Sequence, residues 1–105
     1  MGHDHMDFGI AVYAGSFDPP TLGHAWMIER GARLFEQLIV TIGVNPDKKS
    51  LFSLIEREEM LLALTSGCVN VRVASFENEL LVRFAKRHGA YHILRGIRSS
   101  TDYEY

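Results

Sequence analysis

The stretch GSFDPPTLGH, residues 15–24, decides how this chain folds, together with the apolar run before it. Residues 8–13 are almost entirely apolar, which is typical of a strand covered on both faces. Gly15 has no Cβ and allows the backbone to approach a ligand closely, two prolines restrict φ, and Thr21 is a good helix N-cap. We therefore predict a buried strand, a stiff turn and then a helix.

The first turn of that helix is suited to binding an anion. Unpaired backbone N–H groups and the positive end of the helix dipole both favour negative charge there. Ser16 offers a hydroxyl to a phosphate oxygen, and the imidazole of His24 can donate a hydrogen bond to a phosphoryl oxygen. A plain strand–turn–helix junction with an incidental histidine is the alternative, and the length of the combined pattern disfavours it. The Rossmann pattern G-x-G-x-x-G and the P-loop pattern G-x-x-x-x-G-K-[ST] do not occur.

Apolar, β-prone runs alternate with helical patterns along the rest of the chain. We predict helices over residues 22–35, 53–65 and 79–88, and strands over 37–44, 69–74 and 91–94. Ser53 and Glu56 form a capping-box pattern, and Gly89 suits a left-handed helix C-terminus. This alternation predicts a parallel α/β sheet, and such sheets bind ligands at the C-terminal ends of their strands.

Basic residues follow two of the predicted strands. The second strand leads into NPDKKSLFSLIER, residues 45–57, where Lys48 and Lys49 can reach a phosphate in the adjacent crevice. The alternative is an ordinary solvated loop. The fourth strand leads into Arg95, whose planar fork of donors is suited to binding phosphate.

Composition restricts the class of protein. The chain has 105 residues, which favours one domain, and a formal net charge of −2, which does not suggest a nucleic-acid partner. The longest apolar run, residues 38–44, is far too short to span a bilayer.

Residues 1–7 are polar and His-rich; we expect a tag remnant or a frayed end and place the domain in residues 8–105. Cys68 is the single cysteine, so no intrachain disulfide forms, which fits the cytoplasm.

Three separated motifs resemble those of the phosphopantetheine adenylyltransferases, members of the nucleotidyltransferase superfamily. Residues 15–24 are similar to the (H/T)-x-G-H signature. Residues 45–57 resemble N-P-x-K-K-x-x-F-S-x-x-E-R, and residues 93–105 resemble I-x-R-G-x-R-x-x-x-D-x-E-Y. The resemblance covers residues 8–105 and implies a Rossmann-like fold, in which helices cover both faces of a parallel sheet.

The resemblance also implies an activity. It is the transfer of the adenylyl group of ATP to 4′-phosphopantetheine, which gives 3′-dephospho-coenzyme A and pyrophosphate. Mg²⁺ accompanies ATP, coenzyme A is a product-like ligand, and the family is cytoplasmic and homohexameric. No nucleic acid, membrane, covalent intermediate or protein metal site is implied.

Roles pass from the family to matching residues of this chain. The resemblance implies catalysis by His24 and Lys48. The residues that it implies for the phosphopantetheine site are Ser16, Lys48, Leu80, Leu81 and Arg95. Those that it implies for the ATP site are Ser16, Phe17, His24, Arg98 and Asp102. For Leu80 and Leu81 a plain helix core is an equal alternative, and one extra residue before Leu80 leaves the exact lining residues open. Asp102 can equally be a structural carboxylate at a helix start.

The chain departs from the family pattern at its C-terminal side. The family is longer, and a Ser-rich I-S-S-S motif that contacts ATP phosphates has no counterpart here. We expect a fragment of a longer protein that lacks its C-terminal part, with a natural truncation as the alternative. Two rival functions are a nicotinate or nicotinamide mononucleotide adenylyltransferase and a non-catalytic module that binds nucleotide or coenzyme A.

Overall fold

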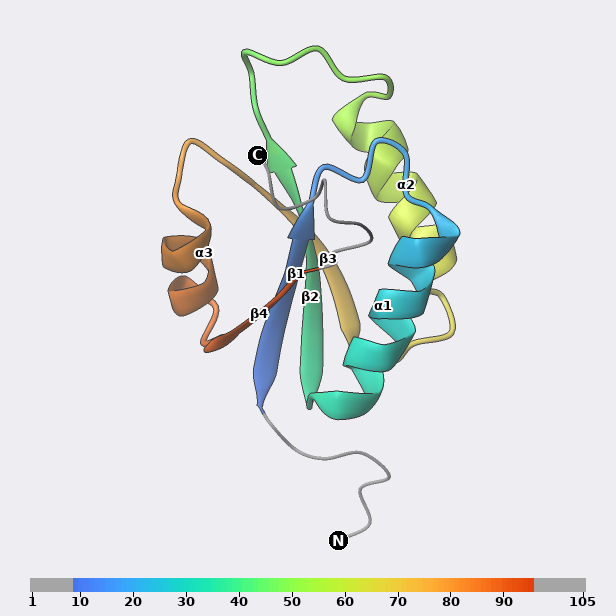
Figure 1. Ribbon diagram of the computed structural model, residues 1–105, viewed down its shortest axis with the longest axis vertical. Helices are drawn as coiled ribbons and strands as arrows, with labels where there is room; N and C mark the ends of the chain where they lie inside the picture. The colour runs from blue at the N-terminus through green and yellow to red at the C-terminus, as the bar shows by residue number, and fades with distance from the viewer. Residues whose placement is uncertain (1–8, 96–105) are drawn as a thin grey trace, which may run out of the picture.

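The computed structural model describes residues 9–95. In this part of the chain a parallel sheet of four strands, in the order β3-β2-β1-β4, is covered by three helices (Figure 1). The elements are β1 (Ile10–Gly15), α1 (Leu22–Leu34), β2 (Gln37–Val44), α2 (Leu54–Leu64), β3 (Val71–Glu77), α3 (Leu81–Arg87) and β4 (His92–Leu94). The predicted parallel α/β architecture is confirmed.

Helices cover both faces of the sheet, as predicted. Alternate side chains of the central strands point to opposite faces, because the side-chain period of a strand is two. On one face Leu38 and Val40 pack with Ile28 of α1 and Leu61 of α2. On the other, the smaller core includes Val12, Ile39, Phe84, Ala85 and Ala90. Figure 1 shows α1 and α2 on one side of the sheet and α3 on the other.

Both predicted helix N-caps of the first half of the chain are present. The Thr21 side chain accepts a hydrogen bond from the backbone N–H of His24, and Ser53 does the same for Glu56. In each case the side chain of the third helical residue accepts the N–H of the cap residue, which completes a capping box. Gly89, with φ +74°, has the predicted left-handed conformation.

Several predicted boundaries were wrong by two or three residues. β1 spans Ile10–Gly15 rather than residues 8–13, and β3 spans Val71–Glu77 rather than 69–74, because the parallel register pairs Leu38 with Val71 and Val44 with Glu77. Asn70 ends the turn before β3 by donating to the Ala32 and Phe35 carbonyls.

α3 begins at Leu81 rather than at residue 79. Asn78 has φ +58° and Leu80 is extended, so neither residue continues a helix. Residues 1–7, Arg98 and Asp102 lie outside the described residues, so the predictions that concern them stay predictions.

Candidate functional site

A pocket of about 440 Å³ lies at the C-terminal ends of β1 and β2. The loop after β1, the end of β2 and the loop before α2 supply its walls. The lining residues are Ser16, Asp18, Gly43, Val44, Asn45, Pro46, Lys48, Lys49, Ser50, Leu54 and Arg57. Three cationic side chains and one carboxylate line the pocket, so its charge favours an anionic ligand. Ser16 and Lys48, which the sequence places in one site, both line this pocket, and their roles there stay predictions.

Phe17 fixes the loop after β1 through its side chain. The residue has φ +49° and is 1% exposed. The ring packs edge-on against Tyr13 and His24, with centroids 5.5 and 4.8 Å apart. A Cβ on Gly15 would lie 3.3 Å from this ring, so glycine suits that position. Because the whole residue is buried, the structure does not expose Phe17 to a ligand, and its predicted contact with ATP stays a prediction.

His24 lies in the first turn of α1, where contacts with Thr21 and Phe17 help to orient its ring. Its Nδ1 accepts a hydrogen bond from the backbone N–H of Thr21 at 2.9 Å, and its ring packs edge-on against the Phe17 ring. A neutral imidazole that accepts through Nδ1 carries its proton on Nε2. This tautomer is compatible with donation through Nε2, and the role of His24 toward phosphate stays a prediction.

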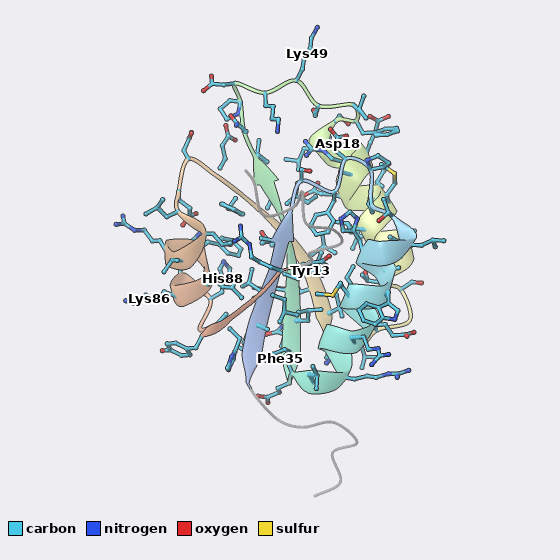
Figure 2. All side chains as sticks on the ribbon, viewed as in Figure 1. Tyr13, Asp18, Phe35, Lys49, Lys86 and His88 are labelled. Atoms are coloured by element: carbon cyan, nitrogen blue, oxygen red, sulfur yellow. The ribbon has the colours of Figure 1, made fainter. Side chains whose placement is uncertain are left out.

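Lys48 lies on an exposed loop between β2 and α2. The loop turns through two local hydrogen bonds: Asp47 N–H donates to Asn45 Oδ1, and Lys48 N–H donates to the Asn45 carbonyl, at 3.0 and 3.1 Å. The neighbouring Lys49 extends outward from the tip of the loop (Figure 2). Lys48 and Lys49 both contribute to the pocket wall.

Sequence reasoning missed two charged residues of the pocket, Asp18 and Arg57. The Asp18 carboxylate accepts the backbone N–H groups of Leu51 and Phe52 at 2.7 and 2.8 Å. Arg57 is 6% exposed and donates to the Ser16 carbonyl at 3.0 Å. Both residues stand inside the recognised motifs, but nothing in the sequence links positions that are 33 to 41 residues apart.

Of the predicted residues that the structure describes, Arg95, Leu80 and Leu81 do not line this pocket. Arg95 is exposed and follows β4, which pairs with β1 through Tyr13 and Leu94. Leu80 is 71% exposed before α3, whereas Leu81 packs against the smaller core. Leu81 is thus part of the helix core, as the alternative had it, whereas the side chain of Leu80 is exposed and accessible to a ligand.

The fold and this strand-end pocket define a nucleotidyltransferase-type α/β protein, and the chain belongs to the cytidylyltransferase-like family, whose model matches residues 12–105. It is 56% identical over 95 residues to the phosphopantetheine adenylyltransferase of Neisseria meningitidis serogroup C, which covers 90% of this chain and 56% of that protein. The protein of the same name from Chromobacterium violaceum is also 56% identical, over 90% of this chain and 58% of its own length. This chain therefore spans little more than half the length of these curated relatives.

A solved structure shares the fold. Nicotinic acid mononucleotide adenylyltransferase from Plasmodium falciparum, complexed with NaAD, superposes with a TM-score of 0.59 at 21% identity, over 81% of this chain and 49% of that one. At this identity the likeness concerns the fold alone. Within residues 9–95 no helix is long and apolar enough to cross a membrane.

Proposed function

We propose that the protein to which this chain belongs transfers the adenylyl group of ATP to 4′-phosphopantetheine, giving 3′-dephospho-coenzyme A and pyrophosphate. The observation that carries the proposal is the cationic pocket in which Ser16 and Lys48 meet, within a sequence 56% identical to proteins named phosphopantetheine adenylyltransferase. The chemistry required is the positioning of two phosphates and the stabilisation of charge, which this strand-end site can supply.

The reaction is an in-line displacement at the α-phosphorus of ATP. A phosphate oxygen of phosphopantetheine forms the new bond to phosphorus, and the bond to the β-phosphate oxygen breaks, so that pyrophosphate leaves with the electron pair. The attacking phosphate is largely ionised at neutral pH, so no general base is required. We assign His24, through Nε2–H, and Lys48 to the charge that develops on the α-phosphate. We assign Ser16 and Arg95 to the attacking phosphate.

Magnesium enters the proposal with ATP. Among residues 9–95 no group of three His, Cys, Asp or Glu side chains is placed to hold a metal ion. Mg²⁺ is commonly bound through substrate phosphates and water, with few protein ligands, and it would screen the β- and γ-phosphates here. We also propose a cytoplasmic homohexamer, on the resemblance to the family; sedimentation of a chain of family length tests the assembly.

A substrate screen tests the proposed function. Pyrophosphate release from ATP is measured with 4′-phosphopantetheine and, in parallel, with nicotinate mononucleotide, on this chain and on a version continued to the length of its relatives. We expect release with phosphopantetheine by the longer chain. Release only with nicotinate mononucleotide would replace this function by the rival one. Calorimetric binding of coenzyme A without turnover by either chain would indicate a non-catalytic module.

A further inference from the structure

Asp18 connects the loop after β1 to the loop after β2. Each of its two carboxylate oxygens accepts one backbone N–H, from Leu51 and from Phe52, which lie 33 and 34 residues further along the chain. A carboxylate that accepts two N–H groups from one peptide segment fixes both the distance and the orientation of that segment. Asp18 therefore determines where the segment after Lys48 returns toward α2.

Arg57 makes the reciprocal connection. From the first turn of α2, its Nη1 donates to the Ser16 carbonyl at 3.0 Å, and its Nε donates to the Ser53 carbonyl at 3.3 Å. Asp18 and Arg57 both line the pocket, yet the structure describes no ion pair between them. Asp18 instead accepts hydrogen bonds from the backbone of the segment before α2, and Arg57 donates one to the backbone of the loop after β1.

The two loops carry the groups that must act on one reaction centre. Ser16 belongs to the loop after β1, and Lys48 to the loop after β2. Residues 45–52 are exposed, and the bonds that turn them are local, so their position relative to Ser16 depends on contacts that cross between the loops. Asp18 and Arg57 supply such contacts from opposite sides.

We propose that Asp18 and Arg57 are positioning residues that hold Lys48 and Ser16 in the arrangement needed for adenylyl transfer. The inference rests on the proposed function. It concerns geometry rather than direct contact with the reacting phosphates. A displacement of about 1 Å at a reacting centre can lower a rate by about 100-fold, so loss of one cross-loop contact has a measurable effect.

The test is a double-mutant cycle in a chain of family length. Asp18→Asn keeps the shape of the side chain but leaves one oxygen to accept, and its amide group then faces an N–H. We expect kcat/KM to fall about 10- to 100-fold. Asp47→Asn is the matched control, because it makes the same change of charge in an exposed residue outside the pocket wall, on the loop that carries Lys48; it should retain wild-type activity.

The cycle pairs Asp18→Asn with Lys48→Ala. If Asp18 acts by positioning Lys48, the change at Asp18 costs little more once the lysine amine is gone, and the two effects are not additive. A merely structural Asp18 would lower the midpoint of thermal unfolding and would multiply the effect of Lys48→Ala. Multiplicative effects, or equal activities of Asp18→Asn and Asp47→Asn, would overturn the proposal. If Asp18→Asn does not fold, Asp18→Glu and Arg57→Lys, which keep the charges but shift the donor and acceptor atoms, take its place in the cycle.

Amide hydrogen exchange separates this inference from the proposed function. The Leu51 and Phe52 amides should be protected in the wild-type and Asp47→Asn proteins, and should lose protection in Asp18→Asn. If the wild-type chain of family length shows no adenylyl transfer, the proposed function is refuted. The amide exchange of Leu51 and Phe52 still shows in that case whether Asp18 holds the loop. Unchanged protection in Asp18→Asn refutes the cross-loop contact itself.

Discussion

The loop after β1 and the loop after β3 both lead from a strand into a helix, but only the first caps its helix with side-chain hydrogen bonds. Thr21 and His24 cap α1 reciprocally, and the Phe17 ring is buried beneath the turn. The loop after β3 ends at Leu80, which caps α3 without a side-chain hydrogen bond and leaves its own side chain 71% exposed. The first loop is thus prearranged by its own side chains, whereas the second leaves the apolar side chain of Leu80 exposed at its end.

The largest effect expected from this difference is at His24. His24→Ala removes both the donor that we propose for the phosphate and the acceptor for the Thr21 N–H. We expect kcat to fall about 100-fold or more, which is the effect of losing one donor to transition-state charge. The helix should also lose roughly 1 kcal/mol of stability, as for a lost cap. Steady-state kinetics and thermal unfolding of a chain of family length measure both.

His24→Glu separates the two functions of the residue. A glutamate at the third helical position completes a capping box, so the midpoint of thermal unfolding should return toward the wild-type value. Its carboxylate cannot donate a hydrogen bond and repels phosphate, so kcat should stay low. A catalytic rate restored together with stability would make His24 a capping residue alone.

Local features of the site could be predicted from the sequence, and long-range features could not. Thr21, Ser53 and Gly89 act on neighbours within a few residues, so their patterns identified two helix starts and one helix end correctly. The contacts of Asp18 with Leu51 and Phe52 depend on how β1 and β2 pair, which no local pattern states. The start of α3 was misplaced for a related reason: Glu79 looks helical, but its carboxylate pairs with Arg87 while the backbone before it is left-handed at Asn78.

A substitution at Arg95 tests whether the proposed phosphate site extends from the pocket past β1 to the end of β4. Arg95→Lys keeps the charge but replaces a planar fork by a point charge, and a bidentate contact is lost. We expect the affinity for 4′-phosphopantetheine to weaken by roughly tenfold, about 1.4 kcal/mol. Calorimetric titration measures the affinity. Equal affinities of the two proteins would confine the phosphate site to the pocket between β1 and β2.

Leu80 tests the other loop, where stability and binding should change in opposite directions. Leu80→Ser supplies the side-chain cap that α3 lacks, so we expect the free energy of unfolding to rise by about 1 kcal/mol. The same change removes an exposed apolar group, so the affinity for coenzyme A should fall if Leu80 contacts the pantetheine arm. Val82→Ser, at another exposed position on α3, is the control for loss of apolar surface. Equal coenzyme A affinity in all three proteins would leave Leu80 outside the site.

The smallest effect is expected at His88, which Figure 2 shows at the end of α3. Burial, together with the positive charges of Arg72 and Arg87, lowers the pKa of His88 from 6.5, and the opposing charge of Glu79 does not cancel this. Arg72 Nη2 lies 2.8 Å from His88 Nδ1, and a guanidinium can only donate, so the contact requires a neutral ring there. Above pH 6.5 the ring is neutral in both folded and unfolded chains. As the pH falls below 6.5, the unfolded chain takes up a proton that the folded chain resists, so stability decreases.

His88→Gln, whose side-chain oxygen can accept from Arg72 without titrating, should flatten the stability curve between 6.5 and the lowered pKa of the folded chain. Chemical unfolding at several pH values measures this difference, and an NMR titration of His88 gives its pKa. Protonation of His88 should change enzymatic activity only indirectly, through the stability of α3, which positions Leu80. A change in kcat that tracks His88 with stability unchanged would mean that the α3 side takes part in the chemistry, and the contrast between the two loops would then be wrong.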